Sequence, residues 1–134
     1  MKIRGKERHF ELNVQSYFEI EQICEGQDFA NFGKLFEGNT SGQNIQVDMQ
    51  VACILNKGFE DRMAFEDPDY KPEYLTMEDM KFMSLENIQK MEAELLEAVS
   101  TGQAVTIETE EPKPEPSSGK KTDADDAGSG SASS

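Results

Sequence analysis

The chain contains no tryptophan, a single histidine and only two cysteines among its 134 residues. His9 with no CxxC pair argues against a tetrahedral zinc site. Nothing in the sequence brings Cys24 or Cys53 to His9 as a nucleophile–histidine pair. Both cysteines stand in apolar patterns, so we interpret them as buried side chains in a reducing compartment. We expect no metal site and no bound cofactor.

Long apolar runs and glycine-rich loops are also missing. No run of about 18 apolar residues occurs, so the sequence predicts no membrane-spanning helix. Gly33, Gly38 and Gly42 are irregularly spaced and no Gly-Lys-Ser/Thr follows, which argues against a phosphate loop. Carboxylate pairs are frequent, but chance alone produces them in a chain with 27 acidic residues. We therefore predict a protein without catalytic residues that is not an enzyme.

Positive charge is scarce, with 13 Lys and Arg against 27 Asp and Glu and a net charge of -14. This excess repels a phosphate backbone, so we expect no nucleic-acid partner. It also favours solubility and a basic or adaptable protein partner. The cations Lys2, Arg4, Lys6 and Arg8 cluster at the start of the chain. We interpret the cluster as a solvated strand face, with a phosphate or partner contact as the alternative.

The first residues predict a β-hairpin over 1–15. Phe10, Leu12 and Val14 alternate with polar side chains, which is the period of a half-buried strand. The turn is expected at residues 5–7. Because a two-stranded ribbon is marginal alone, we expect it to pack on helices or to pair with another copy.

From Ser16 the apolar period becomes helical. Ser16 is the expected N-cap, with Glu19 completing a capping box, and Gly26 is expected to stop the helix. Asp28 is then expected to cap a second helix that ends at Gly38.

A long helix is predicted from about residue 43 to about residue 63, with Gly58 as a weak point. Two prolines make residues 65–74 a loop or irregular link. Thr76 and Asp79 resemble a capping box and begin a short methionine-rich helix.

The clearest helical pattern comes last. Ser84 is the expected cap and Gly102 the expected end, and residues 105–107 are predicted to add a short strand. The seam of this helix consists of Leu85, Ile88, Met91 or Glu92, Leu95 and Val99.

Beyond residue 108 the composition turns to Pro, Glu, Ser and Gly, with no apolar side chain large enough to offset ordering. The sequence therefore predicts a helical domain over 1–107 and a disordered acidic tail over 108–134. The fold class is mainly α (α+β), with an N-terminal β-hairpin followed by four to five helices.

Two apolar stripes are candidate partner-binding surfaces. A stripe at helical spacing usually belongs to the core, and methionines also fill ordinary cores, so the core is the alternative for both. The first stripe is Phe29, Phe32, Leu35 and Phe36, and the second is Met77, Met80 and Met83.

The opening MKIRGKERHFELNV, the NFGKLFEG segment, the central helix ending in NKGFEDR and the final helix SLENIQKMEAELLEAV form one layout. This layout, over roughly residues 1–107, resembles the tail assembly chaperones of long-tailed bacteriophages and of prophages of Gram-positive bacteria. The likeness lies in the order and texture of the segments.

The resemblance implies a non-enzymatic factor that coats the tape measure protein, keeps it soluble and recruits tail tube subunits. It implies self-association into oligomers, a location in the host bacterial cytoplasm and absence from the mature virion. In many such systems a frameshift near the end of the gene produces a longer second form.

Two other classes stay open. An acidic protein of this size is also expected among nucleic-acid mimics that inhibit DNA-binding enzymes, although the basic N-terminus fits that class poorly. A small structural tail-completion or connector protein shares the size and the hairpin, and would be present in virions.

Overall fold

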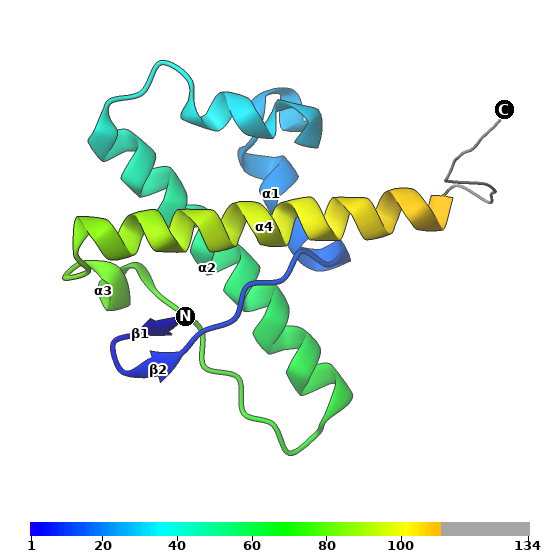
Figure 1. Cartoon of the computed structure of the whole chain (residues 1–134). Coiled ribbons are helices and arrows are strands. Elements are labelled where there is room, and N and C mark those ends of the chain that lie inside the picture. The colour runs from blue at the N-terminus through cyan, green and yellow to red at the C-terminus, as the bar shows by residue number, and fades with distance from the viewer. Residues whose placement is uncertain (111–134) are drawn as a thin grey trace, which may run out of the picture. The chain divides into compact units, whose positions relative to one another are not determined.

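The computed structural model describes residues 1–110, most of them helical (Figure 1). The chain forms two units, Met1–Gly102 and Gln103–Ser134, and the fold below is that of the first. The prediction of a mainly helical fold that begins with a β-hairpin is confirmed.

The hairpin is much shorter than predicted. Strand β1 (Lys2–Ile3) pairs antiparallel with β2 (Lys6–Glu7), with Lys2 opposite Glu7. The turn lies at Arg4 and Gly5, not at residues 5–7, and both have positive φ (53° and 80°). Two successive positive φ values match the right-handed twist of a two-residue hairpin turn.

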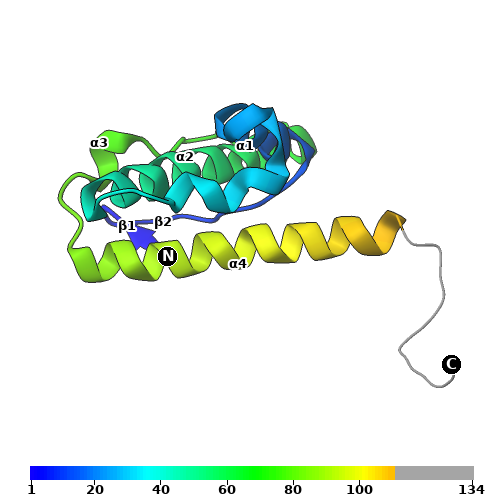
Figure 2. The ribbon, with the colours of Figure 1, turned by 90° about the horizontal axis from the view of Figure 1, so that it is seen from above.

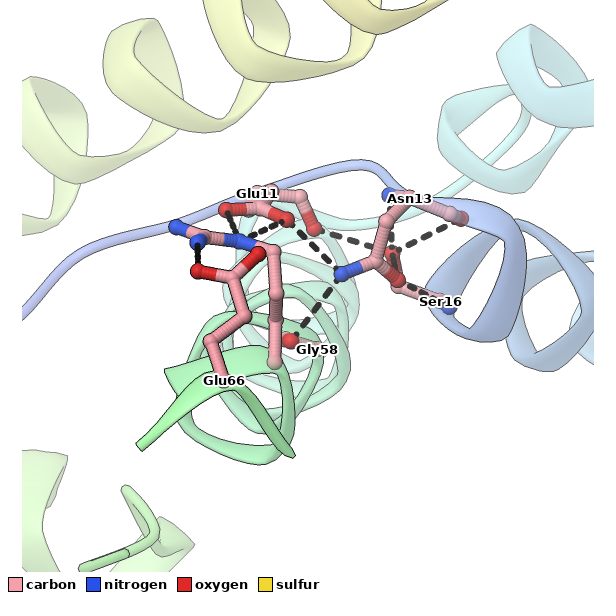
Figure 3. Close-up of polar contacts among 6 residues, drawn as sticks. Glu11, Asn13, Ser16, Gly58 and Glu66 are labelled. Carbon is pink, nitrogen blue, oxygen red and sulfur yellow. Dashed lines mark hydrogen bonds and ion pairs between the residues drawn. The ribbon is translucent and has the colours of Figure 1, made fainter. Parts of the chain in front are cut away.

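The alternating residues 8–13 form no strand, contrary to the prediction, but a strap that crosses helix α2 (Ser41–Glu66) (Figure 3). The Glu11 backbone N–H donates to the Leu55 carbonyl at 3.1 Å, and the Asn13 amide donates to the Gly58 carbonyl at 3.0 Å. The Glu11 carboxylate pairs with Arg62 at 2.8 Å. The strap thus finds polar partners on a helix rather than on a second strand.

Helix α1 (Val14–Ile23) begins three residues earlier than predicted. Asn13 is its N-cap, and Ser16 is the reciprocal partner of the capping box rather than the cap itself. The predicted weak point, Gly58, lies where Ser16 meets α2. A Cβ at Gly58 would lie 3.0 Å from the Ser16 Cβ, so the missing side chain permits the close crossing.

The next segment is 3₁₀ rather than α-helical. Helix η1 (Glu25–Gln27) follows α1 directly, and Gly26 lies inside it at φ 67° instead of ending α1. As predicted, Asp28 caps η2 (Phe29–Phe36), accepting from the Ala30 N–H at 2.9 Å.

Helix α2 starts from a Thr40–Gln43 capping box and continues through Glu66, so Phe65 is helical rather than part of the loop. The predicted Thr76–Asp79 box does begin the short helix α3 (Met77–Met80).

Helix α4 (Leu85–Glu110) has the predicted Ser84 cap, whose hydroxyl accepts from the Asn87 N–H at 3.1 Å. It does not end at Gly102, and residues 105–107 are helical, not a strand. Gly102 lies inside the helix, and a side chain at this position would collide with Leu12 of the strap. Of the predicted tail, residues 108–110 continue α4, and residues 111–134 lie outside the described residues.

The core is formed between α1, α2 and the first part of α4, which Figure 2 shows along one side of the other helices. Both cysteines are free, Cys24 buried and Cys53 half-buried, so the expectation of core positions is met fully by Cys24 and partly by Cys53. The buried apolar side chains are Ile3, Ile20, Cys24, Phe29, Val51, Ala52, Leu55, Leu75, Met80, Ile88, Met91, Leu95 and Val99.

Candidate partner-binding surface

The aromatic stripe is largely part of the protein interior. Phe29 is buried and stacks on Tyr17 with ring centroids 4.4 Å apart. Phe32 continues the stack at 5.6 Å from Phe29, and Phe36 meets Phe32 edge-on at 5.9 Å. Phe32 and Leu35 are half-buried against the core. The stripe packs η2 against α1. This placement corresponds to the alternative that the sequence left open, in which the stripe belongs to the core.

The methionine stripe divides between core and surface. Met80 is buried, Met83 is half-buried, and Met77 is 46% exposed. A four-residue helix followed by a turn does not keep side chains three apart on one face, so the spacing alone overstated the continuity of this stripe.

The turn between α3 and α4 exposes the largest apolar side chains near Met77. Phe82 is 90% exposed and Leu85 is 68% exposed. The Lys81 ammonium lies 5.2 Å from the centre of the Phe82 ring. We call Met77, Phe82 and Leu85 the apolar corner. Sequence reasoning missed Phe82 and assigned Leu85 to a buried seam; the signal for Phe82 is a large aromatic residue in a polar turn.

A groove of about 460 Å³ opens beside the apolar corner. Ile3 of the hairpin and Met83 supply apolar walls, while Arg4, Asp79 and Asn87 supply polar ones. The groove therefore joins the hairpin to the α3–α4 turn, and both apolar side chains and hydrogen-bonding groups line it.

Ion pairs bind the basic N-terminus to the acidic segment 73–79. Arg4 pairs with Asp79 at 2.9 Å and Lys6 pairs with Glu73 at 2.6 Å. Arg8 is buried, donates to the Glu73 carbonyl and lies 3.8 Å from Asp79. A backbone hydrogen bond from Thr76, assisted by Arg4, lowers the pKa of Asp79. Three of the four cations thus serve to close the fold, an outcome that neither sequence interpretation anticipated.

Buried polar side chains of α2 hold the same segment from the other side. The Asn56 amide donates to the His9 carbonyl at 3.0 Å and its oxygen accepts from the Leu75 N–H at 2.9 Å. Glu60 accepts from the Tyr70 hydroxyl at 2.8 Å. Since these groups are buried and paired, they fix the 67–76 loop and so position α3 and the corner.

The cysteines and the histidine are separately placed. His9 packs on Phe59 at 4.7 Å between ring centroids. Burial is the main cause that raises the pKa of both thiols, Cys24 and Cys53, which lowers their thiolate content. Within residues 1–103, no three His, Cys, Asp or Glu side chains gather as a metal-binding group.

None of the helices in the described part of the chain has the length and apolar content to span a bilayer.

Comparison with protein-family models, with curated proteins and with solved structures gives no match to this chain. The corner and its groove are the surface with the most exposed apolar side chains close together in sequence.

Proposed function

We propose that this protein is a tail assembly chaperone that binds the tape measure protein of a long-tailed phage or prophage and keeps it soluble. The observation that supports this most directly is the apolar corner, which places two exposed side chains, Phe82 and Leu85, beside a groove on a chain of net charge -14.

The physical reasoning starts from what a holder of an aggregation-prone helical chain requires. Apolar anchors such as Met77, Phe82 and Leu85 supply adaptable contact with an amphipathic helix. The excess of carboxylates keeps the coated complex apart from other copies. Many copies on one long client gain avidity, so each contact can be weak and reversible during tail polymerisation.

The proposal extends to the partners and location that this role requires. The chaperone recruits tail tube protein to the coated client, self-associates along it, acts in the host bacterial cytoplasm and is absent from the finished virion. Mass spectrometry of purified virions tests the last point. Stoichiometric amounts of this chain in virions would instead identify a structural tail protein.

The direct test is a light-scattering assay with a fragment of the tape measure protein encoded in the same genome. Wild-type protein is expected to suppress precipitation of the fragment. The double variant Phe82→Ser/Leu85→Ser is expected to lose this protection while keeping its fold by circular dichroism. Phe65→Ser is the matched control, because Phe65 is 89% exposed but lies at the end of α2.

Two results would contradict the proposal. One is precipitation of the fragment to the same extent with and without wild-type protein. The other is full protection by the double variant, which would remove the apolar corner from the binding surface.

A further inference from the structure

Asp48 of α2 is a buried carboxylic acid. Its side chain is 3% exposed, and its Oδ1 accepts no hydrogen bond from any residue in the described range. Most buried polar atoms in folded proteins are paired, because an unpaired one loses its water without compensation. Asp48 therefore lowers the stability of the fold that contains it.

The first part of α4 lies near enough to Asp48 for a charge on this helix to act on it. It crosses α2 (Figure 1) and contributes Ile88, Met91, Leu95 and Val99 to the core. The charge that acts on Asp48 comes from Glu92 of this helix and has the same sign. Burial first, and Glu92 second, raise the pKa of Asp48 to about 7. The apolar side chains of α4 thus fit the core, whereas the negative charge of Glu92 is unfavourable for a carboxylate at Asp48.

We propose that the α2 face beneath α4 is a binding groove for an amphipathic helix that carries a lysine or arginine opposite Asp48, with α4 as its resident occupant. The spacing of the buried apolar side chains of α4 indicates which spacing a replacing helix would need. A cation in the position of Glu92 would supply a partner for Asp48.

The contacts of α4 are of a kind that a second helix can replace. They are mainly apolar and so depend little on direction. Within residues 85–102, Glu94 forms an ion pair with the Met1 amino group at 3.5 Å. Residues 81–84 join α4 to α3 without helical structure, so α4 is connected to the rest of the first unit through a short turn.

The groove is distinct from the apolar corner, and the inference does not depend on the identity of the client. It specifies the chemistry of a partner: an apolar stripe at helical spacing plus one basic residue. An acidic or neutral helix with the same stripe is expected to exchange with α4 far less well, because it would repeat the mismatch.

The test uses fluorescently labelled peptides that span residues 84–102 of this chain, with full-length protein as the receptor. One peptide carries Glu92→Lys and the control peptide carries Glu97→Lys. The two have the same net charge, so general attraction to the acidic protein cancels. The Glu92→Lys peptide is expected to bind about tenfold more tightly by fluorescence anisotropy.

The receptor variant Asp48→Asn, isosteric and checked by circular dichroism, is expected to abolish that difference. In full-length protein with Glu92→Lys, the new lysine should pair with Asp48 and hold α4 in place. This protein is therefore expected to bind the peptide more weakly than protein with Glu97→Lys. Equal binding of the two peptides, a difference that survives Asp48→Asn, or no saturable binding would each overturn the proposal. These peptide results stand apart from the precipitation assay, so either proposal can fail alone.

Discussion

Replacement of Asp48 by asparagine is expected to stabilise the protein above pH 7 and to change little near pH 4. The pKa of Asp48 is about 7 in the folded chain, compared with 3.8 for an ordinary aspartate. Below pH 4 the carboxyl is protonated in both folded and unfolded chains. Between these values the unfolded chain loses the proton first, so the free energy of unfolding falls as pH rises.

The size of the effect follows from that difference in pKa. At about 1.4 kcal/mol per pH unit, the folded state is penalised by about 4 kcal/mol once the pH is well above 7. Asparagine keeps the shape of the protonated acid and its unpaired polar atoms, so it removes only the cost of ionisation. Allowing for local relaxation, we expect Asp48→Asn to gain about 2 to 4 kcal/mol at pH 8.5.

The assay is urea unfolding followed by circular dichroism at several values between pH 4 and pH 8.5. Glu97→Gln is the matched control, since it removes an exposed charge from α4 and is expected to change stability by less than about 0.5 kcal/mol. If Asp48→Asn and wild type lose stability in parallel between pH 5 and pH 8, the carboxyl is not ionising in a buried site and the reasoning is refuted.

Three further predictions concern a buried amide, two glycines and the exposed Phe82. Asn56→Ala leaves the Leu75 N–H and the His9 carbonyl unpaired and should lower the free energy of unfolding by about 2 to 4 kcal/mol in urea titration. Gly102→Ala should cost about 1 to 3 kcal/mol, because its Cβ would lie 2.7 Å from that of Leu12. Gly33→Ala, with nothing within 4 Å, should cost nothing, and equal thermal midpoints for the two glycine variants would contradict the packing. Phe82→Ser should leave the thermal midpoint almost unchanged, so a large drop would show that Phe82 is buried.

The parts of the fold that follow local rules were predictable from the sequence. The capping motif of Thr76 and Asp79 and the caps at Asp28 and Ser84 depend on residues within one turn of each other. The apolar spacing of α4 predicted its buried side chains except at Leu85, which is exposed. The strap was not predictable in this way. Its alternation has the period of a strand, and contacts with distant residues, among them the carbonyls of Leu55 and Gly58, determine that it binds a helix instead.

The glycines show the same limit. Gly58 and Gly102 were expected to weaken or end helices, since glycine is a poor helix former. Gly58 lies inside α2, as predicted, and Gly102 lies inside α4 rather than at its end. Local rules do not show why these positions are glycine: Ser16 and Leu12 approach them closely from other segments and leave little room for a Cβ. The candidate site was only partly predictable for a related reason. Met77 is exposed whereas Met80 is buried, and this difference depends on which side of the four-residue helix α3 faces the core.

The strap has a consequence for the order of events during synthesis. Residues 8–13 leave the ribosome dozens of residues before their partners. These partners are Leu55, Gly58, Arg62 and the Glu73 carbonyl. The strap therefore has no partners while most of the first unit is translated. Closure of this unit is a late, long-range step, which makes slow folding and early capture by cellular folding factors an expected property of the nascent chain.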